Sequence, residues 1–161
     1  MELVLFLNFT ILLLLLYCLI NKKLHPLESI FIILIVEFII STYFAIVTVN
    51  KEFIEISNKS YLLILFRVHE VITLPIIILL YFNGYALLKT KIMKWFSNVL
   101  IIVLLILIEE VIKYWEGITY LQWNVWRSGL FYIFLVLTTS VLLKAYSTIL
   151  RKEERNINAT S

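Results

Sequence analysis

The chain has 161 residues, of which 62% are hydrophobic and 16% are charged, and its formal net charge is +3. Soluble domains contain only about 45–50% apolar residues, and a soluble core of this size could not bury so much apolar surface. The composition therefore excludes an ordinary soluble protein and predicts an all-α, polytopic membrane protein. Its single cysteine, Cys18, excludes an intramolecular disulfide and a cysteine-based metal cluster.

Five stretches are long and apolar enough to cross a membrane as helices, which requires about 20 residues each. We expect these helices at Leu3–Ile20, Leu27–Val49, Ser60–Phe82, Phe96–Tyr114 and Val125–Tyr146. They form one bundle over residues 1–150, followed by a short cytoplasmic tail, 151–161. The first is expected to be an uncleaved span rather than a secretory signal, because Met1-Glu2 carries no basic residue and the lysines follow the apolar run.

Two local features of the third span modify its expected helix. Asn83-Gly84 is expected to end it, because both residues tolerate the left-handed geometry that closes helices. Pro75 removes a backbone hydrogen bond and predicts a kink about one turn from Glu70. The hydroxyl of Thr73 is then placed to bond a carbonyl that the kink sets free.

The lysine and arginine distribution predicts the orientation, because cytoplasmic loops carry an excess of these residues. Nine follow the first, third and fifth spans: Lys22, Lys23, Lys89, Lys91, Lys94, Lys144, Arg151, Lys152 and Arg155. Four lie in the opposite loops or at the neighbouring helix ends: Lys51, Lys59, Lys113 and Arg127. We therefore expect the N-terminus outside and the C-terminus in the cytoplasm. The Ile-, Asn- and Lys-rich composition favours the cytoplasmic membrane of a bacterium.

Ionisable residues within the spans indicate where the protein works, since a charge at the bilayer centre costs at least about 3 kcal/mol. The candidate site residues are Glu37, Arg67, His69, Glu70, Glu109, Glu110 and Lys113. From a rise of ~1.5 Å per residue, the four carboxylates fall between the midplane and the outer third of three helices. The sequence thus predicts a polar cluster in the outer half of the bundle.

Helical spacing predicts partners for two of these carboxylates. Arg67 and Glu70 are three residues apart and share one face of the third span. Glu37 has only Ser41 one turn further along its own helix, so its partner must come from another helix. Arg67 is expected to be that partner.

A count that includes Lys113 predicts a surplus of negative charge among the buried residues. Lys113 lies four residues beyond Glu109 and three beyond Glu110, hence between them on the helix. Four carboxylates then face two fixed cations, so a proton, a cationic His69, a metal cation or water is needed, chiefly at Glu109 and Glu110. His69 points away from Arg67 and is interpreted as a hydrogen-bonded or proton-relay residue, since a lone histidine predicts no metal site.

We expect no enzymatic activity. Glu109-Glu110 resembles the paired glutamates of intramembrane CAAX-type proteases, but those enzymes need histidines on later helices, and no histidine follows His69 in this sequence. The sequence also lacks a Gly-x-Ser-x-Gly elbow, a phosphate-binding glycine loop and a His-x-x-x-His zinc pattern.

One stretch carries a family resemblance. Its features are Pro75, Tyr81, Glu109 or Glu110, Tyr120, Trp123-Asn124 and Ser128. With these features, residues 70–143 resemble a family of small multi-pass membrane proteins of spore-forming Bacillota. That family has no established activity, so the resemblance implies the helical layout alone.

Two functional hypotheses follow from the buried charges. In the first, a non-enzymatic integral membrane protein binds or relays a proton, cation or small polar ligand there, as a small transporter or a sensor component. In the second, the protein is a structural or accessory subunit of a larger membrane complex, and the charges form ion pairs. Both hypotheses place it in the lipid bilayer, with a second copy or another membrane protein as partner and without cofactor, metal ligand set or nucleic acid.

Overall fold

The computed structural model of the chain describes the backbone of residues 1–160 and the side chains of residues 1–153. It is all-α and 80% helical, and five helices of the described chain are long and apolar enough to cross a membrane. Its helices are α1 (Glu2–Leu19), α2 (Pro26–Phe44), α3 (Ser60–Val68), α4 (Leu74–Tyr85), α5 (Lys91–Tyr114) and α6 (Val125–Thr160). Short π-helical turns are η1 (Ala45–Asn50) and η2 (His69–Thr73), and short strands are β1 (Ile54–Ile56) and β2 (Ile118–Tyr120).

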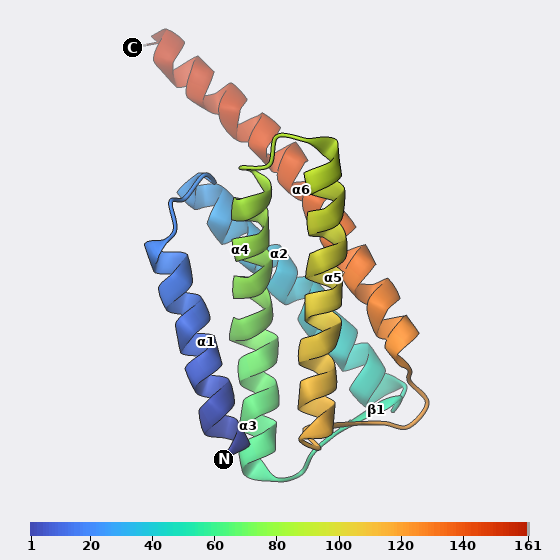
Figure 1. Ribbon diagram of the computed structural model, residues 1–161. Helices are drawn as coiled ribbons and strands as arrows, with labels where there is room; N and C mark the ends of the chain where they lie inside the picture. The colour runs from blue at the N-terminus through green and yellow to red at the C-terminus, as the bar shows by residue number, and fades with distance from the viewer. Residues whose placement is uncertain (161) are drawn as a thin grey trace.

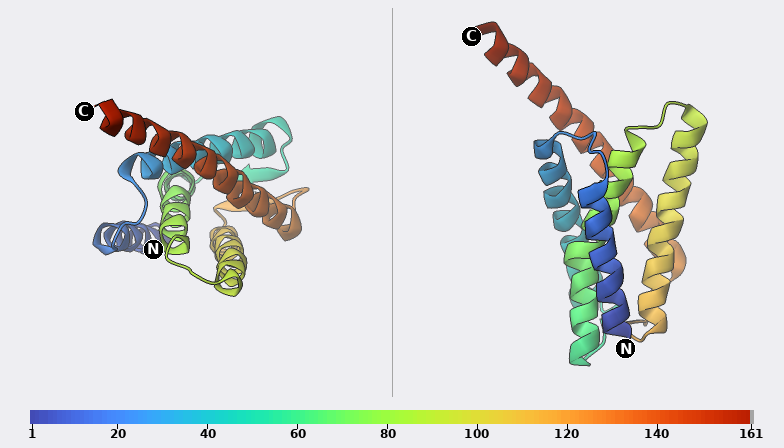
Figure 2. Two further views of the ribbon diagram at one scale, coloured as in Figure 1. Left: turned by 90° about the horizontal axis from the view of Figure 1, so that it is seen from above. Right: turned by 60° about the vertical axis from the view of Figure 1, so that its left-hand side comes forward.

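The third span, made of α3, η2 and α4, lies in the middle of the bundle (Figures 1 and 2). Helices α1, α2 and α5 pack around it, and α6 packs across α2 and α5. The N-terminus and both strands lie at one end of the bundle, which we call the sheet end. The turns that join α1 to α2 and α4 to α5 lie at the opposite end, which we call the lysine end because it carries Lys22, Lys23 and Lys89.

A two-stranded antiparallel ribbon covers the sheet end. Ile54 of β1 pairs with Tyr120 of β2, and Ile56 pairs with Ile118. Ile54 and Ile118 are buried, so the ribbon turns an apolar side toward the helices. The ribbon thereby joins the α2–α3 connection to the α5–α6 connection, which are distant in sequence.

The end of the third span and the start of the fourth differ from the sequence prediction. The fourth span begins at Lys91 rather than near Phe96, because the Thr90 hydroxyl accepts a hydrogen bond from Met93 N at 3.3 Å and caps the helix. The third span continues through Asn83-Gly84 to Tyr85, so the prediction that this pair ends the helix is wrong.

Asn83 instead fastens the α1–α2 turn to α4. Its buried side-chain oxygen accepts a hydrogen bond from Lys23 N at 2.7 Å, and its amide donates to the Asn21 carbonyl at 3.3 Å. The side chain therefore satisfies backbone groups of a turn that has no regular structure of its own.

The predicted irregularity at Pro75 takes the form of the π-helical turn η2. Pro75 stands in the first turn of α4, where a missing N–H costs least. The Thr73 hydroxyl donates to the Val68 carbonyl at 3.2 Å, as expected for a carbonyl set free by the irregular turn. Thr73 also shares a hydrogen bond of 2.9 Å with Thr10 of α1, which joins the first and third spans.

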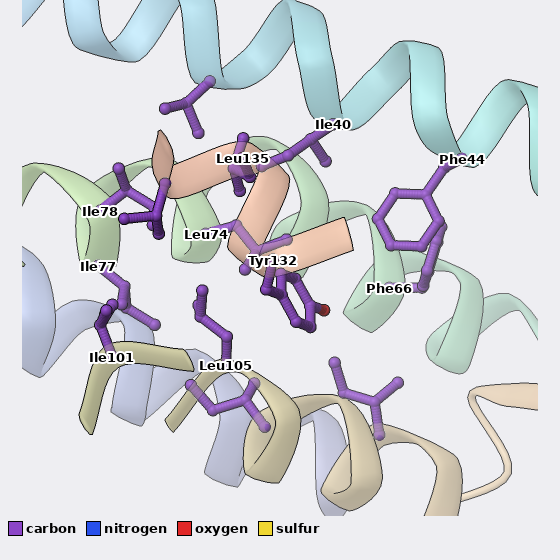
Figure 3. Close-up of a cluster of buried hydrophobic side chains, with 14 of the residues drawn as sticks. Ile40, Phe44, Phe66, Leu74, Ile77, Ile78, Ile101, Leu105, Tyr132 and Leu135 are labelled. Carbon is purple, nitrogen blue, oxygen red and sulfur yellow. The ribbon is translucent and has the colours of Figure 1, made fainter. Parts of the chain in front are cut away.

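The apolar core lies between α2, the third span, α5 and α6 (Figure 3). Phe44 and Phe66 meet edge to face with ring centroids 4.9 Å apart. Tyr132 of α6 is fully buried among these side chains, so the core receives one hydroxyl group.

Helix α6 continues without a break past its predicted end at Tyr146. Its 36 residues measure about 54 Å, against about 30 Å for a hydrocarbon core. Its C-terminal turns project beyond the lysine end (Figure 1). The expected tail, 151–161, is thus helical as far as Thr160, and Ser161 lies outside the described residues.

Candidate functional site

Glu109 of α5 lies in a cluster of hydroxyl groups. Its side chain is 3% exposed. Its Oε1 atom accepts one hydrogen bond from the Tyr120 hydroxyl of β2 at 2.6 Å and another from the Ser128 hydroxyl of α6 at 2.8 Å. The indole N–H of Trp123 donates to Ser128 Oγ at 2.9 Å, which orients that hydroxyl toward the carboxyl group. Three segments beside α5 therefore build this site, which we call the Glu109 site.

Two further tyrosines border the Glu109 site. Tyr132 and Tyr43 lie close enough to Glu109 to interact with it electrostatically. Within the described side chains, neither hydroxyl has a hydrogen-bond partner of normal geometry, although both are buried. Tyr43 also packs edge to face against Trp123, with ring centroids 5.9 Å apart. The site thus contains two buried hydroxyl groups that have no hydrogen-bond partner among the described side chains.

Glu110 is in a different environment from its neighbour. Lys113 Nζ lies 3.1 Å from Glu110 Oε2, and both side chains are about one-third exposed. The same ammonium lies 4.5 Å from the centroid of the Tyr120 ring. The spacing prediction is confirmed for Glu110, which forms the ion pair with Lys113, whereas Glu109 is hydrogen-bonded to hydroxyl groups.

A second group of charges lies on α2 and the third span. Arg67 Nη1 lies 2.5 Å from Glu70 Oε2, as the spacing predicted. Glu70 is buried, whereas the Arg67 side chain is 58% exposed. Glu37 does not pair with Arg67: its Oε1 accepts from Ser41 at 3.2 Å, and its buried Oε2 has no partner within the described side chains. The charged group that acts on Glu37 is Glu70.

His69 is apart from both groups. Its side chain is 1% exposed, and neither ring nitrogen has a hydrogen-bond partner among the described residues. Its ring packs edge to face on Phe6 of α1, with centroids 5.9 Å apart. The prediction of a hydrogen-bonded or proton-relay histidine is therefore wrong for the described residues, since the His69 ring lies in an apolar contact.

The structure shows which carboxylates of the predicted cluster lack a paired cation. Arg67 is assigned to Glu70 and Lys113 to Glu110, each by a direct ion pair. Within the described side chains, Glu37 and Glu109 have no cation within ion-pair distance. The two surplus carboxylates are on different helices, and Glu109 is the more deeply buried.

The described side chains contain no group of three or more His, Cys, Asp or Glu that could hold a metal ion. The oxygen atoms around Glu109 are those of a carboxyl group, a serine and tyrosines. Such a set suits a proton or a weakly held monovalent cation better than a transition metal, which prefers nitrogen or sulfur ligands.

Tyr120 is outside the apolar spans and has a perturbed acidity. Burial, together with the nearby Glu109 carboxylate, raises the pKa of the Tyr120 phenol well above its usual range. The phenol therefore remains a hydrogen-bond donor to Glu109 at all physiological pH values.

The sequence did not single out the partners of Glu109 as site residues. Tyr43 and Tyr132 resemble ordinary aromatic residues of apolar spans. Tyr120, Trp123 and Ser128 appeared only as features of the family resemblance, and no helical spacing joins them to Glu109. No family model, curated protein or solved structure matches this chain.

Proposed function

We propose that the protein is a small, non-enzymatic protein of the bacterial cytoplasmic membrane that binds a proton at Glu109. It acts as a proton-coupled transporter or as a sensor component. In this proposal the sheet end and the N-terminus face outward, and the lysine end faces the cytoplasm, because the lysine end and the α6 extension carry most of the basic residues.

The observation that supports this proposal most strongly is the environment of Glu109. The carboxyl group is buried and receives two hydroxyl hydrogen bonds, but no described cation pairs with it. An ionised carboxylate buried without a counter-charge has a large free-energy cost. A bound proton removes the charge and leaves the hydrogen bonds from Tyr120 and Ser128 in place.

A hydrogen bond also connects the buried site to the surface. Tyr120 is half-buried and belongs to the ribbon at the sheet end, whereas Glu109 is inside the bundle. Tyr120 is the donor in the bond of 2.6 Å between them, so the buried carboxyl group is hydrogen-bonded to a residue of the sheet end. Because the sheet end faces outward in this proposal, we expect the proton to exchange with the outside.

Infrared difference spectroscopy tests the proton site directly. The protein in liposomes at neutral pH should show the carbonyl band of a protonated carboxyl group, which shifts in deuterated water. The substitution Glu109→Gln should remove this band, and Glu110→Gln should leave it, because Glu110 is paired with Lys113. Both variants should keep the helical circular dichroism of the wild type.

Two results would count against the proposal. A band that survives in Glu109→Gln and disappears in Glu37→Gln would move the site to the other surplus carboxylate. A band that appears only when sodium is removed would identify a cation, and not a proton, as the normal occupant.

The accessory-subunit hypothesis is supported by a different observation. Arg67 is 58% exposed within an apolar span, and Glu37 on the neighbouring helix α2 has an Oε2 atom without a partner among the described side chains. A charged side chain at this depth normally faces protein or water rather than lipid. Purification from native membranes tests this hypothesis: loss of a co-purifying membrane protein in Arg67→Gln would support it, and a lone monomer in the wild type would oppose it.

A further inference from the structure

A cavity of about 640 Å³ lies at the lysine end between α4, α5 and α6. Three basic side chains line it: Lys94 from α5, and Lys144 and Arg151 from α6. Lys144 and Arg151 are seven residues apart, which is two helical turns, so they share one side of α6. The cavity thus collects positive charge from two helices that are distant in sequence.

No described carboxylate lines this cavity or lies within ion-pair distance of its three cations. The acid in contact with its lining is Glu28, which accepts a hydrogen bond from the Ser147 hydroxyl. Glu28 is already engaged as a helix cap, because it also accepts from His25 N at 2.9 Å. Among the described side chains, the mutual repulsion of the three cations is therefore not offset inside the cavity, and an anion bound there would offset it.

The cavity also has an apolar floor. Phe82 of α4 and Leu143 of α6 contribute apolar surface to its lining, and the Tyr85 ring lies 5.3 Å from Lys94 Nζ. Tyr85 lines a second, almost wholly apolar groove of about 700 Å³ between α1, α4 and α5. A ligand bound at the cations therefore meets apolar surface on its other side.

The position of the cavity matches a membrane surface. Helices α5 and α6 diverge toward the lysine end (Figure 2), where the cavity lies between them and α4. Trp95, beside Lys94 on α5, is 69% exposed. Exposed tryptophan next to lysine is typical of the level of the lipid headgroups.

We propose that this cavity binds the phosphate headgroup of an anionic phospholipid from the leaflet at the lysine end. Lys94, Lys144 and Arg151 bind the phosphate oxygens, and the acyl chains lie on the apolar surface formed by Phe82, Leu143 and the membrane. Basic pockets between membrane helices recognise anionic headgroups in this way. The proposal rests on the membrane-spanning arrangement but not on the proton site at Glu109.

Native mass spectrometry of the protein in a neutral detergent, with added phosphatidylglycerol or phosphatidylcholine, tests this proposal. The wild type should retain phosphatidylglycerol in preference to phosphatidylcholine. The triple variant K94Q/K144Q/R151Q should bind phosphatidylglycerol at least about tenfold more weakly. The matched control K22Q/K23Q/K89Q removes the same charge from the same end, outside the cavity, and should stay within about twofold of the wild type.

Equal weakening in both triple variants would overturn the proposal, since it would indicate general surface charge. Displacement of phosphatidylglycerol by millimolar inorganic phosphate would identify a soluble anion as the ligand and would also overturn it. If the cavity variant does not fold, a photoreactive phosphatidylglycerol can label the wild type. Labels should then map to residues 82–94 and 140–151, and labels elsewhere would contradict the assignment.

Discussion

Glu109 and Glu110 show how far two adjacent residues can differ within one helix. Successive side chains point about 100° apart around an α-helix, so one faces α6 and the ribbon while the other faces Lys113. Spacing rules relate residues within one helix, and they placed Arg67 beside Glu70 and Lys113 beside Glu110. The partners of Glu109 come from β2 and α6, which only the tertiary structure brings to α5.

The raised pKa of Tyr120 predicts a specific loss of stability at high pH. The folded protein holds the phenol proton more tightly than the unfolded chain, whose tyrosines titrate near pH 10. This contribution to the free energy of unfolding is complete below about pH 10 and is lost as the pH rises toward the folded-state pKa. Chemical unfolding in detergent at a series of pH values should show this decline.

Two substitutions separate Tyr120 from the other tyrosines. Tyr120→Phe should make the alkaline decline shallower, and should lower stability at neutral pH by about 1 kcal/mol through loss of the hydrogen bond to Glu109. Tyr114→Phe alters an exposed phenol on the neighbouring helix and should leave both quantities unchanged. An unchanged slope in Tyr120→Phe would refute the assignment.

At the scale of the elements, hydropathy located all five spans because each needs a long apolar run. The boundaries were harder to predict, since they depend on individual hydrogen bonds. Asn83-Gly84 has the composition of a helix end, but the side chain of Asn83 bonds to the turn after α1. That turn is 60 residues away in the sequence, so no local pattern could reveal the contact.

Asn83 predicts a test of how the α1–α2 turn is held. Asn83→Ala should lower the free energy of unfolding by about 1–3 kcal/mol, because it leaves buried backbone groups of the turn without partners. Asn21→Ala is the matched control, since only the backbone carbonyl of Asn21 takes part. Unfolding curves in detergent measure both, and equal effects would contradict this role.

The ribbon depends on a close approach at Gly117. A Cβ atom there would lie 2.9 Å from Ile112 Cγ2 and 3.1 Å from the Ile112 carbonyl oxygen. Gly117→Ala should therefore destabilise the protein by about 1–3 kcal/mol. Gly84→Ala meets nothing within 4 Å in the helix α4 and should be neutral or stabilising by up to about 1 kcal/mol. Thermal unfolding of the two variants gives the comparison, and a neutral Gly117→Ala would contradict the close packing.

At the scale of the whole molecule, the arrangement of the spans could not be read from hydropathy. Every span has a similar apolar composition, yet the third lies in the middle and the first lies at the edge (Figure 2). The expected single cluster depended on which helices are neighbours. With the observed neighbours, the candidate residues separate into the Glu109 site, the Glu110–Lys113 ion pair, the group around Glu70 and an isolated His69.

The proposed orientation predicts a labelling pattern. In a Cys18→Ser background, Asn58→Cys lies at the sheet end and Lys89→Cys at the lysine end, both at exposed positions. A membrane-impermeant maleimide should label position 58 in intact cells and position 89 only after lysis. The reverse pattern would overturn the orientation and would also reverse the leaflet from which the proposed lipid at the lysine end is drawn.

The position of Tyr120 in β2 connects the ribbon at the sheet end to the buried Glu109 site. The same residue completes the ribbon, opposite Ile54, and donates to Glu109. On the proposed proton site, occupancy of the site and order of the ribbon are thermodynamically linked, and the linkage is reciprocal. A molecule that displaces the ribbon removes the Tyr120 hydrogen bond and so changes proton binding at Glu109, and loss of the proton in turn changes the hydrogen-exchange protection of the ribbon amides. On this proposal, a change in ribbon order alters proton occupancy, and a change in proton occupancy alters ribbon order.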